Sequence, residues 1–460
     1  MNIIEKIFKR TKKIPSPYQT VKLVSAQNLA WRRAVYVFFI IVFLIVTPLI
    51  VLYSQGYRYN FKRGKVQKTG ILIISSIPKS ADIYLNNQLV TQDQTPARLE
   101  KLLPADYEIK LAKEGYHNWT KKLQLNENST TFAEDVILWK NNWPIQLAPN
   151  NIIEWLASPD WQKAVFITPD RKIMALDLAT KKFYELYQAG NDDNLKILSW
   201  SNTSKKILIE VGDQYLIFNA ERYQTAPIII SNDYALLKWD LKNDNLVYGL
   251  NSAGVWKIDL FTKKSGLLLN REVTDFLING DLVYFYYKDV IYKQKISGRS
   301  QPEIIDGLKC PACRFINREF ARLLLLDDQA QKLFIIDPIL KNKTIKQSAK
   351  NISWLKADTL LFYNNWEIWI YELDKEEPEI ITRIGTGISE ALWHPAGRHI
   401  IFNSEDKIKI IELDDRELRN VIELFAGAQI NYLTLDDKGK NLYFQALIAD
   451  KTYLMELIIK

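Results

Sequence analysis

The chain of 460 residues contains only two cysteines and three histidines. A zinc site at Cys310 and Cys313 would need two more ligands, which His117, His394 and His399 would have to supply, so we expect no metal site. The chain also lacks a P-loop, a Ser-centred nucleophile elbow and a His-Glu-x-x-His motif. We therefore expect no cofactor and assign no catalytic residue.

Charged side chains are absent from residues 34–53, which read AVYVFFIIVFLIVTPLIVLY. About 20 residues at about 1.5 Å rise per residue span a hydrocarbon core of about 30 Å. The preceding segment is too long for the n-region of a signal peptide, and Ser54-Gln55-Gly56 is a poor cleavage site. We therefore expect a retained transmembrane helix at 34–53 and a juxtamembrane linker at 54–68.

Basic residues are concentrated around this apolar segment. Residues 1–68 hold 13 basic side chains and one acidic side chain, so the remaining residues carry a net charge of 8 − 12 = −4. Eight of the basic residues precede the apolar segment and five follow it, which favours a cytoplasmic segment 1–33 and an extracytoplasmic remainder. The acidic remainder does not attract phosphate backbones, so we exclude nucleic acid as a partner.

Four tryptophans recur at one spacing. Trp200 and Trp239 are 39 residues apart, as are Trp354 and Trp393, and the interval between the pairs fits three further steps of about 38 residues. Each step begins with an aromatic or apolar residue and a polar turn, followed by short β-rich runs. Such a unit cannot bury its own faces, so we predict stacked blades of a β-propeller at 140–460.

The repeat begins at eight positions, which are Ala157, Trp200, Trp239, Ile278, Asn317, Trp354, Trp393 and Leu435. We predict eight blades, with seven as the alternative if the unit at Ile278 or Asn317 is irregular. The last unit ends after its third strand, and Trp143–Leu147 is similar to the outer strand that it lacks. Closing the ring with this upstream strand would remove exposed sheet edges. The repeat resembles the β-propellers of WD40 and TolB-like proteins.

Residues 69–139 alternate apolar and polar side chains without this repeat, which predicts a small antiparallel β-sandwich. The order and spacing of four blocks resemble the PEGA domain family: Ser76-Ile77-Pro78, Thr95-Pro96, Leu103-Pro104-Ala105-Asp106-Tyr107 and Gly115-Tyr116-His117-Asn118-Trp119. Ser80 and Ala105 stand where glycine is usual, so both turns must form without it. The resemblance implies a surface-associated binding or spacer module on an anchored bacterial protein, without catalysis.

Cys310-Pro311-Ala312-Cys313 has the spacing of a redox-active pair. A reactive thiolate needs a helix N-terminus, whereas this pair lies between expected propeller strands. Outside the cytoplasm we expect a local disulfide between Cys310 and Cys313, which closes a small loop and adds little stability.

Polar residues occur three positions before several repeat starts, where the innermost strands line the channel of a propeller. They include Glu154, Asp275, Arg314 and Glu390. One interpretation is structural: buried charges are paired or hydrated, and Asp275 and Arg314 on adjacent blades would pair. The other interpretation makes Glu154, Asp275 and Glu390 an acidic binding site for a sugar or a cation at the channel mouth.

These features favour a non-enzymatic interaction protein of the bacterial cell envelope, held in the cytoplasmic membrane by one helix. Its expected partner is an envelope protein or a polysaccharide, bound through the propeller. The alternative is a propeller glycosidase or lyase that uses the channel carboxylates, which would have to flank a sugar about 5 to 10 Å apart.

Overall fold

The computed structural model describes residues 26–61, 63–148, 151–191, 193–297, 300–310, 312–316, 322–339, 344–356 and 358–460. Most of the basic segment 1–33 and the repeat start at Asn317 lie outside the described residues. In the part of the chain that is described, β-strands predominate and α1 is the single helix. The expectation of a mainly β chain with one N-terminal apolar helix is confirmed.

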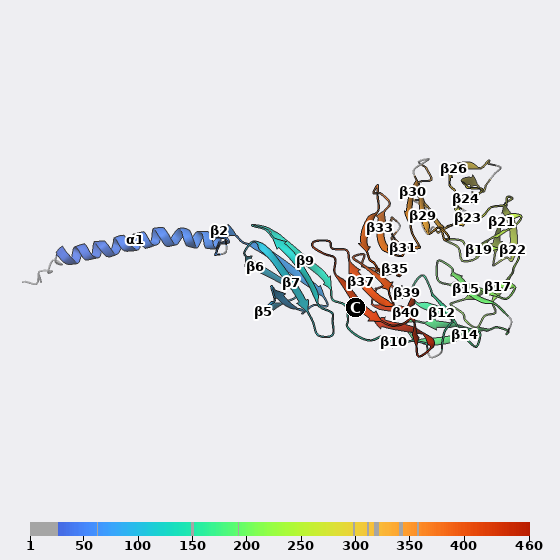
Figure 1. Ribbon diagram of the computed structural model, residues 1–460, viewed down its shortest axis with the longest axis horizontal. Coiled ribbons are helices and arrows are strands. Elements are labelled where there is room, and N and C mark those ends of the chain that lie inside the picture. Colours follow the sequence, from blue (N-terminus) through green and yellow to red (C-terminus); the bar gives the residue numbers. More distant parts are fainter. Residues whose placement is uncertain are drawn as a thin grey trace, which may run out of the picture. The chain divides into compact units, whose positions relative to one another are not determined.

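Helix α1 (Ala26–Ser54) contains the whole uncharged segment 34–53 (Figure 1). Its section Ala30–Ser54 is long and apolar enough to cross a membrane, and it is not buried inside the structure. A core helix of a soluble domain would be covered by other elements. By length and composition, the exposed apolar helix therefore fits either a membrane anchor or a signal sequence.

The chain divides into two compact units. The first unit contains α1 and the antiparallel hairpin of β1 (Tyr57–Asn60) and β2 (Lys65–Lys68), and it consists of Met1–Ile73, Arg98–Asp106 and Gln124–Phe132. The second unit consists of Ile74–Ala97, Tyr107–Leu123 and Ala133–Lys460. All of the repeats, and much of the β-region before them, therefore belong to the second unit.

Residues 69–139 contain two sheets, with strand orders β6-β3-β9 and β5-β4-β7-β8. Their strands are β3 (Gly70–Ile77), β4 (Asp82–Leu85), β5 (Gln88–Gln94), β6 (Ala97–Leu102), β7 (Ala105–Ala112), β8 (Trp119–Leu125) and β9 (Thr130–Ile137). Buried residues alternate with more exposed ones along β3 and β8. This period of two gives each strand one buried face, as the sequence pattern predicts.

Ser80 forms its turn in the conformation that usually favours glycine. Its φ is 60°, in the left-handed region that costs a residue with a Cβ about 1 to 3 kcal/mol. The Ser80 amide donates to the Thr95 carbonyl at 2.7 Å, and the buried Thr95 hydroxyl accepts the Ala81 amide at 2.9 Å. These hydrogen bonds hold the turn, so the missing glycine leaves the local fold intact.

Eight four-stranded antiparallel sheets follow in the described part of 140–460, and we number them 1 to 8 in chain order. Sheets 1 and 2 comprise β11 (Glu154–Ala157), β12 (Lys163–Ile167), β13 (Lys172–Asp177), β14 (Lys182–Gln188), β15 (Leu195–Trp200), β16 (Lys206–Val211), β17 (Gln214–Asn219) and β18 (Ile228–Ser231). Sheets 3 and 4 comprise β19 (Leu236–Trp239), β20 (Leu246–Asn251), β21 (Gly254–Asp259), β22 (Lys264–Leu269), β23 (Asp275–Asn279), β24 (Leu282–Tyr287), β25 (Val290–Lys295) and β26 (Glu303–Gly307).

Sheets 5 and 6 comprise β27 (Cys313–Phe315), β28 (Leu323–Asp327), β29 (Lys332–Ile336), β30 (Thr344–Ser348), β31 (Asn351–Lys356), β32 (Thr359–Tyr363), β33 (Glu367–Glu372) and β34 (Glu379–Arg383). Sheets 7 and 8 comprise β35 (Ile388–Trp393), β36 (His399–Ser404), β37 (Lys407–Glu412), β38 (Val421–Ala426), β39 (Asn431–Leu435), β40 (Asn441–Ile448), β41 (Lys451–Ile458) and β10 (Ile145–Gln146). In sheets 1 to 7 each strand pairs with the next one along the chain, so every sheet is a meander.

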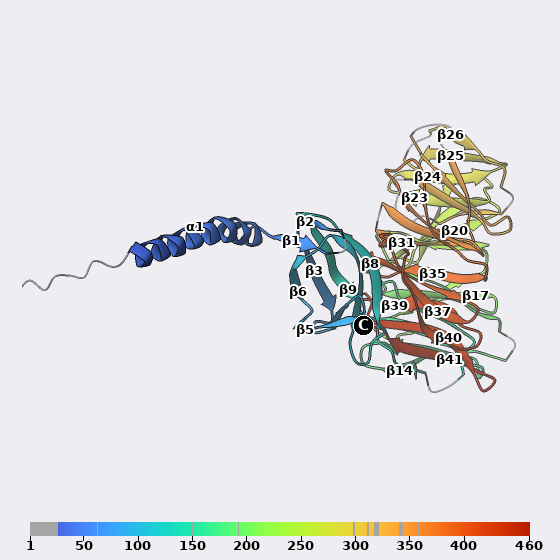
Figure 2. The ribbon, with the colours of Figure 1, turned by 60° about the vertical axis from the view of Figure 1, so that its left-hand side comes forward.

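Sheet 8 takes one strand from the other end of this region. β10 pairs antiparallel with β41, with Ile145 opposite Glu456 and Gln146 opposite Met455. β10 is shorter than the segment 143–147 that we expect to supply a strand. The first strand of sheet 8, β39, contacts β11 of sheet 1. Figures 1 and 2 show the red C-terminal strands beside the green strands with which the repeats begin.

Two of the recurring tryptophans link their sheet to the preceding one. Trp200 Nε1 donates to the Leu156 carbonyl of sheet 1 at 3.1 Å, and Trp239 Nε1 lies 3.4 Å from the Ser199 carbonyl of sheet 2. The apolar core lies between neighbouring sheets: one buried cluster includes side chains of β12 and β13 together with β15, β16 and β17. The 39-residue spacing of Trp200 and Trp239 therefore reflects an indole at the same place in two successive contacts between sheets.

Candidate functional site

The four polar residues predicted at the channel lie on the first strands of their sheets. Glu154 begins β11, Asp275 begins β23, Arg314 lies in β27 and Glu390 lies in β35. Consecutive first strands contact one another, as β11 and β15, β23 and β27, and β35 and β39 do. The first strands therefore place these residues where neighbouring sheets meet.

Each of the three carboxylates accepts a backbone N–H from the first strand of the next sheet. Ile197 N donates to Glu154 Oε2 at 3.1 Å, and Leu433 N donates to Glu390 Oε2 at 2.7 Å. Phe315 N donates to Asp275 Oδ2 at 2.6 Å. A carboxylate that accepts a backbone N–H in this way satisfies a buried donor and links two sheets. These hydrogen bonds therefore support the structural interpretation of the polar residues on the first strands.

The suggested pairing of Asp275 with Arg314 is wrong, because each residue has another partner. The Lys238 ammonium lies 2.6 Å from Asp275 Oδ1, and the Arg314 guanidinium lies 2.6 Å from the Asp328 carboxylate. Lys238 comes from β19 in the preceding sheet, whereas Asp328 immediately follows β28 of the same sheet as Arg314. Sequence alignment of the first strands alone could not show this difference in side-chain direction.

Burial shifts the pKa values of several charged residues on the first strands. Burial raises the pKa of Glu154, although the Ile197 amide and the charge of Lys196 oppose the shift. Burial also raises the pKa of Glu390, against the amides of Leu433 and Tyr432 and the charge of Lys350. Burial lowers the pKa of Lys238, while Asp275 acts in the opposite direction. For each of these groups, burial makes the charged form less favourable, and the neighbouring groups offset only part of that free-energy penalty.

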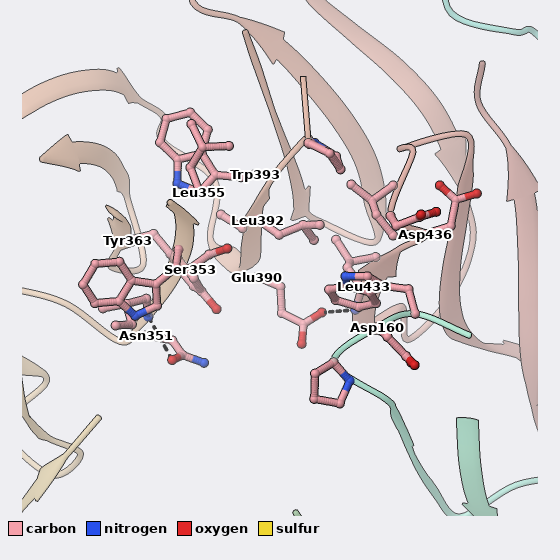
Figure 3. Close-up of a pocket in the computed structure, with 18 of the residues that line it drawn as sticks. Asp160, Asn351, Ser353, Leu355, Tyr363, Glu390, Leu392, Trp393, Leu433 and Asp436 are labelled. Carbon is pink, nitrogen blue, oxygen red and sulfur yellow. Dashed lines mark hydrogen bonds between the residues drawn. The ribbon is translucent and has the colours of Figure 1, made fainter. Parts of the chain in front are cut away.

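A cavity of about 700 Å³ surrounds Glu390. We call it the Glu390 cavity; it is formed by the first strands of sheets 6, 7 and 8 and by the turn after β11 (Figure 3). Its acidic lining residues are Asp160, Glu390, Asp436 and Asp437, and its aromatic lining residues are Trp161, Trp354, Tyr363 and Trp393. No lysine, arginine or histidine occurs among the described residues that line it.

Two neighbouring cavities divide the remaining candidate residues. One, of about 710 Å³, shares Trp161 and Glu390 with the Glu390 cavity. The other, of about 640 Å³, contains Lys238, Asp275 and Arg314. Glu154 lines none of these three cavities. Within the described residues, therefore, no two of the carboxylates named for a glycosidase line the same one of these cavities.

Sequence reasoning missed several lining residues because they occupy the turns after the repeat starts. The Asp160 carboxylate accepts the Ser158 hydroxyl, and the Asp436 carboxylate accepts the amides of Lys440 and Asn441. These bonds are typical of aspartates that stabilise tight turns. The same carboxylates also face the cavity, which the turn pattern alone does not reveal.

A second cluster of buried charge was also missed. Within the second unit, Lys121 of β8 forms an ion pair with Glu412 and lies 3.6 Å from the Asp414 carboxylate. Trp119 Nε1 donates to Glu412 Oε2 at 2.9 Å. Lys121 is 1% exposed and Glu412 is 7% exposed. The alternation of β8 gave a signal, because it places Lys121 on the same face as the buried Trp119 and Leu123.

The histidines and cysteines have structural surroundings. His394 and His399 are buried, and each ring lies edge-on to the Trp139 ring, with centroids about 5 Å apart. A disulfide joins Cys310, which follows β26, to Cys313 at the start of β27, and both cysteines are buried. In the part of the chain that is described, no group of three or more His, Cys, Asp or Glu side chains is placed to hold a metal ion.

Comparison with protein families identifies the N-terminal β-region. Residues 69–136 match the PEGA domain family, which confirms the resemblance carried by the Ser76, Thr95 and Gly115 blocks. No curated protein matches the chain in sequence. The family assignment is therefore limited to this domain and does not extend to the repeats.

The repeats are similar in structure to WD40 β-propellers. The C-terminal WD40 domain of Sif2 aligns with a TM-score of 0.50 and 13% identity, over 69% of this chain and 98% of that one. A eukaryotic initiation factor aligns with a TM-score of 0.49 and 14% identity, over 66% and 83% of the two chains. At this identity the likeness to Sif2 shows the fold alone. The protein thus combines a PEGA domain with repeats that have a WD40-like β-propeller fold.

Proposed function

We propose that this protein is a single-pass, membrane-anchored scaffold of the bacterial cell envelope, whose propeller binds a protein or glycan partner outside the cytoplasm. In this proposal the chain consists of a cytoplasmic region 1–33, a membrane helix 34–53, a linker 54–68, a PEGA domain 69–139 and a propeller 140–460. The excess of basic residues before the helix supports this orientation. PEGA domains are typical of surface-associated proteins, which supports the same location.

The propeller of this proposal has eight blades. Support comes from the eight four-stranded sheets and from the contact between β39 and β11, which joins the last sheet to the first. The pairing of β10 with β41 supports closure by the segment 143–147. A closed ring leaves no first or last sheet without a neighbour, so the ring acts as one rigid support for binding residues.

The observation that carries the binding role is the group of three cavities of about 640 to 710 Å³ along the first strands. Their walls combine apolar and aromatic side chains with a few charged groups, which is the usual composition of a binding site. The carboxylates Glu154, Asp275 and Glu390 hold adjacent first strands together, so the cavity walls are fixed before a partner arrives.

Site-specific photo-crosslinking in intact membranes tests this function. A photoreactive residue at Asp437, which lines the Glu390 cavity, should capture the partner from the protein's native membrane. The same residue at Ile304, an exposed position on the fourth strand of sheet 4, is the matched control. Capture at Asp437 alone supports the proposal, whereas equal capture at both positions or none at Asp437 contradicts it.

Protease treatment of spheroplasts tests the location. The full chain with an N-terminal tag should lose its PEGA domain and propeller to an external protease, while a tagged fragment of the membrane helix and residues 1–33 remains protected. Full protection of the propeller would place it in the cytoplasm and contradict the orientation.

A further inference from the structure

We propose that the Glu390 cavity binds a lysine or arginine side chain presented by a peptide segment of the partner. The inference rests on the proposed function and deepens it, because it names the chemistry of the group that is recognised. It is carried by the charge balance of the cavity, by the geometry of Glu390 and by the aromatic walls.

The charge balance of this cavity differs from that of the cavity beside Asp275. Asp275 has its own cation, because the Lys238 ammonium lies 2.6 Å from its carboxylate. The Glu390 cavity has four carboxylates and no basic residue among its described lining residues. Lys350, whose charge acts on Glu390, does not line the cavity, and its ammonium lies 3.3 Å from the Ser389 carbonyl. The missing countercharge is the group that a partner would supply.

The geometry of Glu390 leaves room for such a cation. One carboxylate oxygen accepts the Leu433 amide at 2.7 Å, which fixes the side chain. Figure 3 shows the other oxygen directed away from Leu433, between the strands that carry Asn351 and Tyr363 and the turn that carries Asp160. A lysine ammonium or an arginine guanidinium at this oxygen would form a charge-assisted hydrogen bond.

The aromatic walls favour the same ligand. Trp161, Trp354, Tyr363 and Trp393 line the cavity, and indole faces attract cations within about 6 Å of their centroids. A lysine or arginine side chain of a peptide provides the positive charge that such aromatic groups attract. A neutral sugar carries no charge, so a basic peptide fits the acidic and aromatic lining of the cavity better.

Titration of short peptides against the full chain in nanodiscs tests this inference. The probes are fluorescently labelled peptides with one central lysine or arginine between glycine and serine residues, and matched peptides with glutamine at the centre. We expect the basic peptides to bind at least tenfold more tightly than the glutamine peptide, with the difference shrinking as salt is added. Equal binding of the three peptides would overturn the inference.

Glu390→Gln is the decisive variant, and Glu154→Gln is its matched control. Both glutamates accept an amide from the next first strand, but only Glu390 lines the cavity. We expect Glu390→Gln to weaken binding of the basic peptides at least fivefold and Glu154→Gln to change it less than twofold. Equal binding by wild type and Glu390→Gln would overturn the inference.

Asp437→Asn provides a second variant if Glu390→Gln fails to fold. Asp437 is exposed on the turn after β39, and its substitution leaves the bonds between first strands unchanged. We expect it to weaken binding of the basic peptides about two- to threefold, and no weakening would count against the inference. Crosslinking from Asp437 distinguishes failure of the cation site from failure of the proposed binding function. Capture of a partner without selection of basic peptides rejects only the cation site. No capture rejects the proposed function itself.

Discussion

The second unit buries charge in two different ways. At the first strands, Glu154 and Glu390 accept hydrogen bonds from backbone amides of the next sheet. At β8, the buried Lys121 lies against Glu412, and Glu412 also accepts Trp119 Nε1 and the Asn420 amide. The first arrangement needs an acceptor, whereas the second needs a charge of the opposite sign.

This difference predicts how each region responds to substitution. An amide side chain can replace a carboxylate that only accepts N–H groups, because the acceptor oxygen remains. Removing one member of a buried ion pair leaves the other charge without compensation in a medium of low dielectric constant. Asp275 lies between these cases, because it accepts the Phe315 amide and also faces Lys238.

The largest effect is expected for Lys121→Ala. The substitution leaves Glu412 buried without its cation and should lower the free energy of unfolding by about 3 to 5 kcal/mol. Urea denaturation of the full chain in detergent, followed by tryptophan fluorescence, measures the change. Lys172→Ala is the control, since Lys172 pairs with Glu185 at 2.8 Å on the surface, where loss of an ion pair changes stability little. Equal losses of unfolding free energy in the two variants would show that burial of the Lys121 ion pair does not increase its contribution to stability.

Acidification should weaken the same part of the second unit. Burial lowers the pKa of His394 to about 4 and that of His399 to about 3. Both pKa values lie below the unfolded value near 6.5, so the unfolded chain binds more protons as the pH falls from about 6.5 towards 4. Stability is therefore complete above about pH 6.5 and falls by about 2 kcal/mol per histidine down to pH 5.

The variant His399→Leu isolates this effect. It should reduce the loss of stability between pH 7 and pH 5 in the same urea experiment, because only His394 then remains to be protonated at this place. The raised pKa values of Glu154 and Glu390 act with the opposite sign, since the folded state binds more protons there. An unchanged pH dependence in His399→Leu would mean that this ring does not control acid stability.

Asp275→Asn should have an intermediate effect. The amide can still accept the Phe315 N–H, but the Lys238 ammonium loses the carboxylate that lies 2.6 Å away. We expect a loss of about 1 to 3 kcal/mol, measured by urea denaturation. The double variant Asp275→Asn with Lys238→Met should recover part of this loss. A double variant no more stable than the single one would indicate that the ion pair is not the cause.

The repeats could be predicted from sequence because several contacts between sheets use a tryptophan at the same position of the repeat. Trp200 and Trp239 fill such contacts, so their spacing in the chain equals the length of one sheet. The strand at 143–147 was harder to delimit, because β10 comprises Ile145 and Gln146, while Leu147 adds one amide bond to the Leu454 carbonyl at 2.8 Å. Short outer strands carry little pattern, so their ends depend on neighbours that sequence does not reveal.

The candidate site was predictable only in part. Period and alignment placed Glu154, Asp275 and Glu390 on first strands, but the partner of each charged side chain depends on its direction. Asp275 pairs with Lys238 of the preceding sheet, whereas Arg314 pairs with Asp328 of its own sheet. Lys121 was within reach of sequence reasoning, since the alternation of β8 places it on the buried face.

The smallest effect is expected for Glu154→Gln. This variant tests whether the first-strand carboxylates need only an acceptor oxygen. The glutamine oxygen can still accept the Ile197 amide, so the loss should stay below about 1 kcal/mol. Glu154→Leu, which removes the acceptor, should cost more, about 1 to 3 kcal/mol, because the Ile197 N–H is then left unpaired. Urea denaturation of the two variants side by side separates loss of charge from loss of the acceptor. If Glu154→Gln destabilises as much as Glu154→Leu, the negative charge is required, and the first-strand carboxylates would then resemble Glu412.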